Sequence, residues 1–515
     1  MIRFLLDSHI HTVENTDPNT TVLNYLRTTL GKTGTKEGCA SGDCGACTIV
    51  LAEVVASENN TLTYTTINSC LTLLPALDGK QLITVEDLKN GDQLHPVQQA
   101  MVDEHGSQCG FCTPGFIMSL FAHYKNTASN TPYNRHKTEL ALGGNLCRCT
   151  GYQPIFNAAQ VLANTPSKHD QFTANSARFI ADLLSIRPSE QHALSNGKQR
   201  AYSPTTIDQL CDLLHLYPEA RLLAGGTDLS LEITQFHKSL DTIIYLGSVE
   251  ALQHISIVDD TLVIGAAASL TQCAAALSQH LPDFAELLNR FASLQIRNQA
   301  TLGGNIANAS PIGDSPPALI AADAYLTLRS ANKSRTIALE DYFTDYKVTE
   351  LTVGEFIESI HIPPQPTHSI YKIYKVSKRL DDDISAVLGA FRITLDDDKK
   401  ITECRLAYGG MAAIPKRAHH TETFLVGKPW DQTTLQTAKQ ELSKDFSPLS
   451  DFRASAEYRA LIAKNLLEKY WIESTPSFKS SATRVTDLSF NQAYSLATDV
   501  GEPAHTAAAP TQGDI

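Results

Sequence analysis

The first 80 residues alternate short apolar runs with polar breaks, as in a small sheet that carries one helix. Residues 2–13 (IRFLLDSHIHTV) contain two β-prone runs around a polar pair, which predicts a hairpin. Residues 20–30 repeat their apolar positions with a helical period, and TIVLAEVV (48–55) and LTYTTIN (62–68) predict further strands. This order of elements predicts a β-grasp fold of the ferredoxin type.

From about residue 82 the pattern becomes helical. Pro96 suits the first turn of a helix that continues through VQQAMVDEH, and a second helix is expected from Pro114 through FIMSLFAHYK. A third helix should precede Gly143-Gly144, and a fourth should begin at Pro154. These four segments predict a helical domain.

The second half of the chain predicts two αβ regions behind a polar connection. RLLAGGTDLSLEI (221–233) has the pattern of a strand, a glycine turn and a helix, and residues 291–322 place a second glycine turn before a proline-rich loop and a helix. The predicted division is a β-grasp domain (1–80), a helical domain (81–165), a linker (166–198), an αβ domain (199–366), a smaller αβ domain (367–475) and a loosely ordered tail (476–515).

Eight of the eleven cysteines fall into two groups of four, enough for two iron–sulfur clusters. The first group has the plant-type ferredoxin spacing: Cys39, Cys44, Cys47 and Cys70. The second group consists of two close pairs at predicted helix starts: Cys109, Cys112, Cys147 and Cys149. Two such clusters in one chain indicate a path for single electrons. The other three stand apart and are expected to be buried small apolar residues: Cys211, Cys273 and Cys404.

Zinc is the alternative for these thiols, because two four-thiolate zinc ribbons would use the same residues. The glycine-rich loop of the first group favours iron–sulfur chemistry. Gly38, Gly42 and Gly45 let backbone N–H groups turn toward cluster sulfurs, which stabilises an added electron. The second group lies where helices begin, and helix N-termini stabilise anionic thiolates.

Two glycine pairs, Gly225-Gly226 and Gly303-Gly304, raise the question of phosphate binding. Neither pair matches the G-x-G-x-x-G fingerprint, so a Rossmann dinucleotide fold is not supported. A single pair of this kind is most often only a turn. Two such loops, each after a strand-like run, could instead close on one pyrophosphate through their backbone N–H groups.

Composition narrows the class of protein. The net charge is −13 without a strong basic block, which argues against binding to nucleic acid or to an anionic membrane. The apolar run Phe4-Leu5-Leu6 ends at Asp7 and is too short for a signal peptide, and no apolar run is long enough to span a bilayer. We therefore expect a cytoplasmic protein, in which clustered cysteines bind metal rather than form disulfides.

Taken together, these motifs resemble the iron–sulfur/FAD chain of the xanthine dehydrogenase group of molybdenum hydroxylases. The resemblance covers most of residues 1–475. It rests on segments that occur in the family's order: KEGCASGDCGACTIV (36–50), INSC (67–70), SQCGFCTPGF (107–116), GNLCRCTGYQPI (144–155), LLAGGTDL (222–229), TLGGNIANASPIGDSPP (301–317) and KVSKRLDDDIS (375–385). Single-chain members continue into a molybdenum domain, so the resemblance assigns that domain to a partner chain.

The resemblance implies roles for these motifs. The first cysteine group would ligate a ferredoxin-type 2Fe–2S cluster, and the second a cluster nearer to molybdenum. Two segments would bind the FAD phosphates: Leu222, Leu223, Ala224, Gly225, Gly226, Thr227, Asp228 and Leu229, then Thr301, Leu302, Gly303, Gly304 and Asn305. Phe291 would lie against the isoalloxazine ring, Asp314 would contact FAD, and Lys375 would lie near the flavin. Gln108 would face the pterin across the subunit interface, and Asp382 would lie on a loop that affects NAD access.

The expected fold class is multidomain α+β: a β-grasp 2Fe–2S domain, a four-helix 2Fe–2S domain, an α+β FAD-binding domain and a smaller α+β flavoprotein domain. The resemblance implies the electron-transfer subunit of a xanthine dehydrogenase. A partner molybdopterin subunit would oxidise hypoxanthine and xanthine to urate, and electrons would pass through both clusters and FAD to NAD⁺. The implied assembly is a pair of heterodimers, with no substrate-oxidising residue in this chain.

Two alternatives remain open from the sequence. The chain could serve a sister hydroxylase whose substrate is an aldehyde, a nicotinate-like heterocycle or an aromatic acyl-CoA, because substrate residues would lie in the partner. It could also be a non-enzymatic electron carrier that stores electrons on a flavin. Reduction of a dye by NADH separates the carrier from the other two, since a mere carrier should not turn NADH over.

Overall fold

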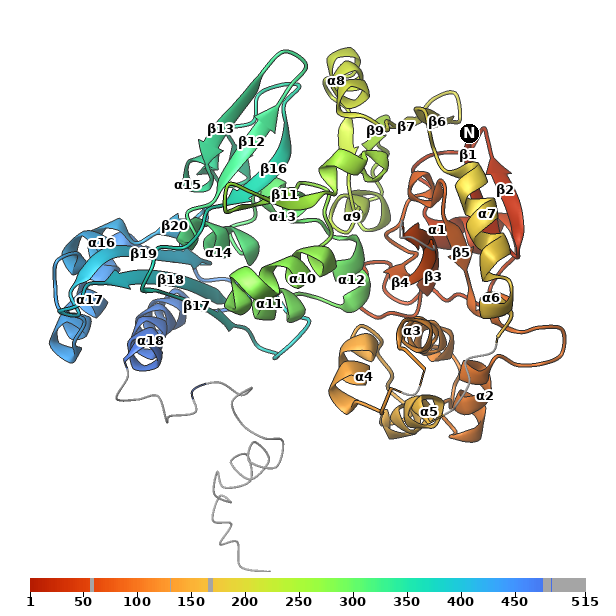
Figure 1. Cartoon of the computed structure of the whole chain (residues 1–515), viewed down its shortest axis with the longest axis horizontal. Helices are drawn as coiled ribbons and strands as arrows, with labels where there is room; N and C mark the ends of the chain where they lie inside the picture. Colours follow the sequence, from red (N-terminus) through yellow and green to blue (C-terminus); the bar gives the residue numbers. More distant parts are fainter. Residues whose placement is uncertain (56–59, 130, 165–169, 476–482, 484–515) are drawn as a thin grey trace, which may run out of the picture.

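The computed structural model describes residues 1–55, 60–129, 131–164, 170–475 and 483. Four modules follow one another along the chain, with the N-terminal module and the helical module on the right of Figure 1 and the C-terminal module on the left. The expected multidomain α+β class is confirmed. Apart from Thr483, the tail predicted after residue 475 lies outside the described residues.

The N-terminal module is a five-stranded sheet in the order β2-β1-β5-β3-β4, with one short helix. The hairpin turns at Asp7 and Ser8, whose positive φ angles of 51° and 62° match the right-handed twist of the paired strands. The elements are β1 (Ile2–Leu6), β2 (His9–Val13), α1 (Val22–Asn24) extended by a π-helical turn (Tyr25–Thr29), β3 (Thr48–Val55), β4 (Thr61–Asn68) and β5 (Gln81–Ile83).

The helical module contains the four predicted helices, and prolines at the first or second position start three of them. Its most buried helix presents nearly every side chain between Gly115 and Tyr124 to the core, because it packs on both the neighbouring helices and the N-terminal sheet. The helices are α2 (Pro96–Asp103), α3 (Thr113–Asn126), α4 (Arg135–Leu142) and α5 (Gln153–Ala163).

The segment expected to be a surface linker is instead structured where it is described. It contains α6 (Gln171–Ala174) and α7 (Ser176–Ile186), and it ends in strand β6 (His192–Ser195). Phe179, Leu183 and Ile186 lie on one face of α7 and are buried against the N-terminal sheet. The polar flanks obscured this apolar stripe, which has the spacing of an amphipathic helix.

The central module is built on two sheets, β6-β7-β9-β8 and β10-β11-β16-β12-β13. The second glycine pair lies inside helix α13, directly after helix α12, and is not a turn after a strand as predicted. The strands are β7 (Arg200–Ser203), β8 (Arg221–Leu223), β9 (Thr242–Tyr245), β10 (Ile255–Val258), β11 (Thr261–Gly265), β12 (Tyr325–Arg329), β13 (Ser334–Ala338), the short pair β14 (Phe343–Asp345) and β15 (Val348–Thr349), and β16 (Phe356–Ile362). The helices are α8 (Ile207–Leu216), α9 (Leu229–Thr234), α10 (Leu270–His280), α11 (Pro282–Asn289), α12 (Leu294–Gln299), α13 (Leu302–Ala307), α14 (Ser315–Ala321) and α15 (Leu339–Tyr342).

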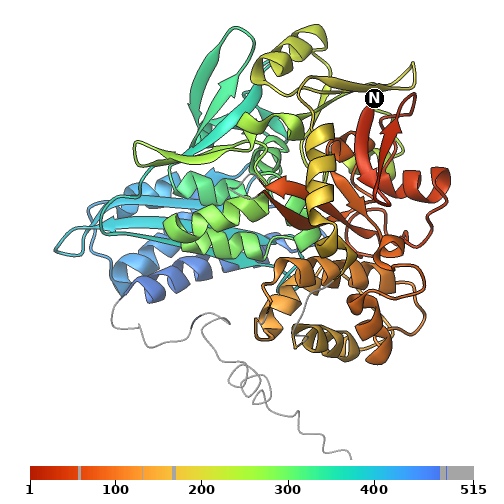
Figure 2. The same ribbon diagram turned by 45° about the vertical axis from the view of Figure 1, so that its right-hand side comes forward.

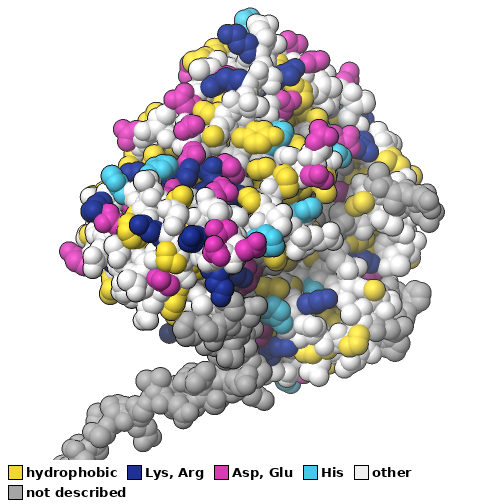
Figure 3. Space-filling model, turned by 60° about the vertical axis from the view of Figure 1, so that its left-hand side comes forward, with side chains coloured by type: hydrophobic (Ala, Val, Ile, Leu, Met, Phe, Trp, Pro, Cys, Tyr) yellow, Lys and Arg dark blue, Asp and Glu magenta, His cyan; other side chains and the backbone are white. Residues whose placement is uncertain are grey.

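The C-terminal module is an antiparallel sheet in the order β17-β18-β19-β20, covered by three helices. Figure 2 shows these helices below and behind the sheet, and on the face in Figure 3 acidic and basic side chains intermix without a patch of one sign. Its elements are β17 (Ser369–Val376), β18 (Val387–Leu395), β19 (Ile401–Gly409), β20 (Lys416–Arg417), α16 (His419–Leu425), α17 (Gln432–Asp445) and α18 (Ala456–Ser474). Over the described residues, no helix combines the length and apolarity needed to cross a membrane.

Candidate cofactor sites

The first thiol site, defined as Cys39, Cys44, Cys47 and Cys70, lies at one end of the β3–β4 hairpin. Thr48 pairs with Asn68 in that hairpin, so the residues just outside both strands must meet. Accordingly, the sulfurs of Cys47 and Cys70 are 3.3 Å apart, and both residues are buried. The preceding loop brings the other two thiols to the same place.

Proton sharing shows how closely these four thiols approach one another. Hydrogen bonds with Cys44 and then Cys70 lower the pKa of Cys39, and a hydrogen bond with Cys70 lowers that of Cys47. The pKa values of Cys44 and Cys70 are raised in turn, chiefly by Cys39. Cys44 and Cys70 therefore hold their protons more tightly than Cys39 and Cys47, and a bound metal must displace those protons.

Backbone amides already point at the first thiol site. The N–H groups of Ser41 and Asp43 donate to the sulfur of Cys39 at 3.4 and 3.3 Å. Gly42 and Gly45 permit this loop because their φ angles are +84° and +70°. Such donors stabilise negative charge on a thiolate and on a cluster that gains an electron.

The second thiol site, defined as Cys109, Cys112, Cys147 and Cys149, lies between the start of α3 and the start of α5. Its thiols also meet in pairs. Burial and then the thiol of Cys147 raise the pKa of Cys112 to about 12, whereas a hydrogen bond with Cys109 raises the pKa of the exposed Cys149. The sulfur of Cys147 accepts hydrogen bonds from the hydroxyl of Thr150 at 3.2 Å and from the N–H of Cys149 at 3.4 Å.

This pairing bears on the choice between iron–sulfur and zinc chemistry. Within the described parts of the chain, no three histidine, cysteine, aspartate or glutamate side chains converge as a single metal ion requires. At the second site the thiols meet in twos, which fits a cluster with two metal atoms, because each iron of a 2Fe–2S cluster takes two of the four thiolates. At the first site all four thiols form one connected group, with Cys39 next to both Cys44 and Cys70. All eleven cysteines are free, and the three isolated ones are buried as expected.

The two glycine segments line one cavity of about 770 Å³ in the central module, called the central cavity here. This volume lies in the range of cofactor sites. Most residues of the predicted phosphate segments face it: Leu222, Ala224, Gly225, Gly226, Thr227, Asp228, Leu229, Thr301, Gly303, Gly304 and Asn305. Leu223 faces away from the central cavity, and Leu302 is buried in the hydrophobic core. Gly226 has a φ of +74°, so a side chain there would strain the backbone, and its Cβ atom would lie only 3.0 Å from the hydroxyl oxygen of Ser230 and 3.2 Å from the backbone oxygen of Leu71.

The three remaining predicted flavin residues lie together at the edge of the central cavity. Phe291 lines it, and its carbonyl oxygen accepts a hydrogen bond at 3.0 Å from the buried Arg297. Asp314 and Lys375 do not line the cavity; they form a buried ion pair of 2.6 Å, with the ammonium group 6.0 Å from the ring centre of Phe291. The hydroxyl of Ser385 donates to the other oxygen of Asp314 at 2.6 Å. This pair holds strand β17 beside Phe291 and α14.

The sequence did not identify the residues that join the first thiol site to the central cavity. Leu231 and Ile296 line the central cavity and also pack against the apolar group that contains Cys47, Cys70 and Leu71. The hydroxyl of Ser230 donates to the carbonyl oxygen of Leu71 at 2.7 Å, which fixes the residue next to Cys70 against helix α9. Leu231 and Ile296 thus contact both the central cavity and the apolar group around the first thiol site.

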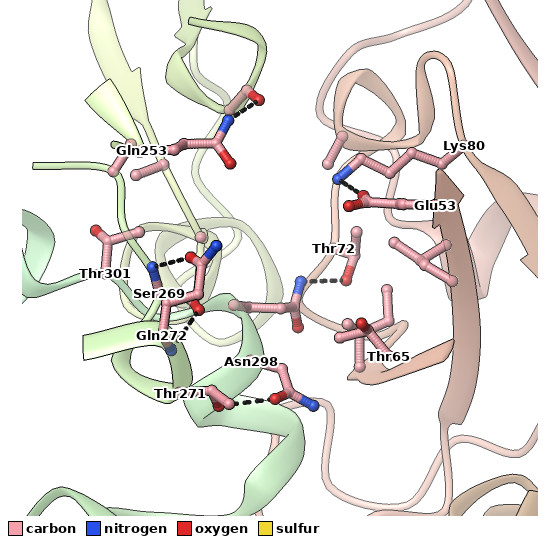
Figure 4. A pocket seen from close by; sticks show the side chains of 18 of the residues that line it. Glu53, Thr65, Thr72, Lys80, Gln253, Ser269, Thr271, Gln272, Asn298 and Thr301 are labelled. Carbon is pink, nitrogen blue, oxygen red and sulfur yellow. Dashed lines mark hydrogen bonds and ion pairs between the residues drawn. The ribbon is translucent and has the colours of Figure 1, made fainter. Parts of the chain in front are cut away.

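A second cavity, of about 430 Å³, lies between the N-terminal and central modules. Figure 4 shows Lys80 and Glu53 paired on one wall, and Ser269 and Gln272 on the other. The polar groups of these walls mostly bond to one another, as in the pair Thr271–Asn298 at 2.8 Å. This cavity is a polar seam between two modules, and four residues of the glycine segments line it as well: Leu223, Ala224, Gly225 and Thr301.

Four family models match successive parts of the chain. Residues 5–74 match the 2Fe-2S iron-sulfur cluster binding domain, and residues 84–160 match the [2Fe-2S] binding domain. Residues 196–365 match the FAD binding domain in molybdopterin dehydrogenase, and residues 372–474 match the CO dehydrogenase flavoprotein C-terminal domain. Both thiol sites fall within the iron–sulfur matches, and the central cavity falls within the FAD match.

Known proteins extend this comparison. The chain is 35% identical over 501 residues to a xanthine dehydrogenase of Emericella nidulans, covering 87% of this chain and 36% of that protein. It is 30% identical over 532 residues to xanthine dehydrogenase 1 of Arabidopsis thaliana, covering 90% of this chain and 39% of that protein. A chain of the carbon monoxide dehydrogenase structure from Hydrogenophaga pseudoflava matches with a TM-score of 0.50 and 25% identity, covering 52% of this chain and 94% of that one. The chain therefore spans less than half of the length of these curated relatives.

Proposed function

The chain belongs to the molybdenum hydroxylase family as an iron–sulfur/FAD chain, and from this we propose that it is the electron-transfer small subunit of a xanthine dehydrogenase. Electrons from oxidation of hypoxanthine and xanthine to urate on a partner subunit would pass through both thiol sites and the central cavity to NAD⁺. The free state of all eleven cysteines supports a reducing compartment, the cytoplasm.

One observation carries this proposal: the three sites form a continuous series. The second thiol site opens to solvent, the first is enclosed between modules, and only side chains such as Ile296 separate the first from the central cavity. A series of redox sites that starts at a surface and ends in a cofactor cavity suits electron transfer between a partner and a flavin.

The residues of this chain would divide the work as follows. The eight paired cysteines would hold two 2Fe–2S clusters, and the glycine segments would hold FAD through their backbone N–H groups. When bound, FAD supplies the change from one-electron to two-electron transfer that reduction of NAD⁺ requires. Arg297 would fix the backbone at Phe291, and Lys375 would place a positive charge near the flavin, held in position by Asp314.

The partner would dock where the second thiol site is exposed. Cys109 and Cys149 are exposed, and Phe111 and Leu146 beside them leave 49% and 52% of their surface uncovered. Exposed apolar side chains around two thiols suit a protein interface better than a solvent-facing loop. Gln108 is exposed on the same face, and we propose that it meets a large molybdopterin-binding subunit there, in a pair of heterodimers.

A sister hydroxylase with another substrate is the second candidate, favoured by the match of residues 372–474 to a CO dehydrogenase flavoprotein domain. This chain offers the same sites to either enzyme, so the partner decides between them. A pure electron carrier is the third candidate. The docking site proposed above for a molybdopterin-binding subunit argues against it.

Expression of the chain alone tests these candidates. We expect bound FAD, about four irons per chain, NADH-dependent dye reduction and no oxidation of xanthine. Addition of the large subunit should then produce xanthine-dependent reduction of NAD⁺. Dye reduction without any response to xanthine in the complete complex would favour the sister hydroxylase, and lack of NADH turnover would favour the carrier.

A further inference from the structure

The loops of the two thiol sites touch each other directly. The N–H of Leu146, next to Cys147, donates a hydrogen bond of 3.0 Å to the backbone oxygen of Cys44. A path of covalent bonds with one hydrogen bond therefore joins a thiol of the first site to a thiol of the second. The first site belongs to the N-terminal module and the second to the helical module, so this contact is also a contact between modules.

Three glycines make this approach possible. A Cβ atom at Gly45 would lie 2.3 Å from the backbone oxygen of Gly144, and one at Gly115 would lie 2.2 Å from the backbone oxygen of Gly45. A Cβ atom at Gly144 would lie 2.1 Å from Oε1 of Gln295. Each glycine comes from a different element, and each clash is with another module or element, so only glycine fits at these three positions.

Four buried polar side chains surround the contact and belong to three modules: Thr48, Ser119, Asn145 and Gln295. Asn145 donates to the backbone oxygen of Gly45 at 3.0 Å and accepts from the hydroxyl of Ser119 at 2.6 Å. Gln295 of helix α12 donates to the side-chain oxygen of Asn145 at 3.1 Å. The hydroxyl of Thr48 donates to the oxygen of Gly45 at 2.7 Å. These donors and acceptors satisfy one another in a single network.

One atom of this network is left over. Among the described residues, Oε1 of Gln295 is buried without a hydrogen-bond partner and lies against Gly144. A buried carbonyl without a hydrogen-bond partner destabilises the folded state. A residue that served only to join the modules could avoid this cost with an apolar side chain. The amide of Gln295 differs from such an apolar side chain in its N–H group, which holds Asn145 in place.

We propose that the Asn145–Gln295 pair is a spacer that fixes the separation of the two clusters and maintains the Cys44–Leu146 hydrogen bond as the main electronic link between them. This inference rests on the proposed two-cluster function. One electron would leave the reduced cluster at the second site and enter the oxidised cluster at the first, with no proton transfer and no change in covalent bonds. The molybdenum centre of the proposed partner would supply this electron. In the test, NADH supplies electrons through the flavin next to the first site, so the same link is crossed in the reverse direction, and dithionite reduces both clusters.

Gln295→Met is the sharpest test, because it keeps the length of the side chain and removes the donor to Asn145. Gln299→Met is the matched control, because it makes the same change on the same helix. The side chain of Gln299 also reaches the N-terminal module, where it donates to the hydroxyl of Thr72 at 2.7 Å and accepts from the N–H of Asn68 at 3.3 Å, but it does not bond to Asn145. Ser119→Ala is a milder variant that removes one donor and leaves a small space, so it should fold even where Gln295→Met does not.

The readout is electron paramagnetic resonance of the dithionite-reduced chain, in which two reduced clusters split each other's signals to an extent set by their separation. We expect the splitting to decrease in Gln295→Met and, to a lesser degree, in Ser119→Ala, while iron and FAD contents stay at the wild-type level. Reduction of the second cluster by NADH should slow roughly 10- to 100-fold in Gln295→Met. Gln299→Met should leave both quantities unchanged.

Three outcomes would overturn the inference: an unchanged splitting in both test variants, an equal loss in Gln299→Met, or loss of splitting together with loss of one cluster. A wild-type chain that lacked two distinct iron signals would contradict the proposed function itself. The two failures are therefore separable, because the inference is judged by the variants and the proposed function by the iron content and iron signals of the wild-type chain.

Discussion

The first thiol site is enclosed by three modules, whereas half of the second faces solvent. Cys47 and Cys70 are buried under Leu71 and Ile296, and Cys109 and Cys149 are exposed at the start of two helices. The same ligand set therefore serves two purposes. Enclosure insulates the site that contacts the flavin cavity, and exposure makes the other site available to a partner.

The two sites also differ in what donates to their sulfurs. Backbone N–H groups of a glycine-rich loop serve Cys39, whereas the hydroxyl of Thr150 and one backbone N–H serve Cys147. Backbone donors are set by the fold of the loop, and a side-chain donor can be exchanged without changing the loop. A substitution at Thr150 can therefore adjust the potential of the second site without changing its loop.

Removal of one ligand from each site should have the largest effect. Cys47→Ala and Cys149→Ala should each retain about two of the roughly four irons, with loss of a different signal. Cys47→Ala should also lower FAD content and thermal stability, because the first site packs against the wall of the central cavity and metal binding contributes to folding there. Cys149→Ala should keep full FAD. Metal analysis, resonance spectra and flavin absorbance check this, and loss of both clusters in either variant would contradict independent sites.

The helical module that carries the second site depends on a buried ion pair, and its loss should have the next largest effect. Asp170 lies 2.9 Å from Lys125 and 3.2 Å from His95. Burial opposes ionisation of Asp170, but hydrogen bonding from His95 and the charge of Lys125 outweigh it, so its pKa is lowered. Asp170→Asn should destabilise this module by about 3 kcal/mol, because it leaves the ammonium group buried without its counter-charge.

The same pair predicts a pH dependence. The folded pKa of Asp170 is below its unfolded value near 4, so its stabilisation is complete above that value and is lost as the pH falls toward the folded pKa. Denaturation at pH 7 and at acid pH should therefore show a smaller difference in Asp170→Asn than in wild type. The exposed Asp103→Asn on α2 is the control and should follow wild type. An equal acid sensitivity in all three proteins would show that Asp170 is not the group involved.

Thiol modification of the metal-free chain would test the difference in solvent exposure between the two thiol sites. Cys109 should react with iodoacetamide much faster than Cys70, because a buried thiol reacts only after local opening. An opening free energy of about 3 kcal/mol would slow Cys70 roughly 100-fold. Peptide mapping at timed intervals measures this order. Similar rates at both positions would mean that the first site is not enclosed in solution.

Local spacing was enough to predict the ligand groups, and it was not enough to predict what surrounds them. Cysteines and helix starts obey short-range rules, so the helices that begin at Pro96 and near Pro114 were located from the sequence. Helix α7 was missed because its polar flanks outweighed three apolar positions that bury only against a distant sheet. The second glycine pair was expected in a turn, but Thr301 caps helix α13 through the N–H of Gly304.

The contacts between modules were the hardest features to predict from the sequence. Asn145 and Gln295 are separated by 150 positions in the chain and meet only because α12 docks on the N-terminal and helical modules. No periodic pattern in the segments around Asn145 and Gln295 predicts that these two residues meet. Gln295 is completely buried, although glutamine is mostly found on protein surfaces. Only the folded structure shows this burial.

The smallest effect is expected from the donor that distinguishes the second site. Thr150→Val keeps the shape of the side chain and removes the hydroxyl that donates to the sulfur of Cys147 at 3.2 Å. A hydrogen bond to sulfur stabilises the reduced state more than the oxidised one, so its loss should lower the midpoint potential of the second cluster only. About 1 kcal/mol for the bond corresponds to roughly 40 mV for one electron.

Thr150→Ser keeps the hydroxyl and should keep the wild-type potential, so it separates the effect of the hydrogen bond from the effect of packing. A redox titration followed by resonance spectra resolves the two clusters, and a shift at the first cluster, or none at either, would show that this hydroxyl does not tune the second site.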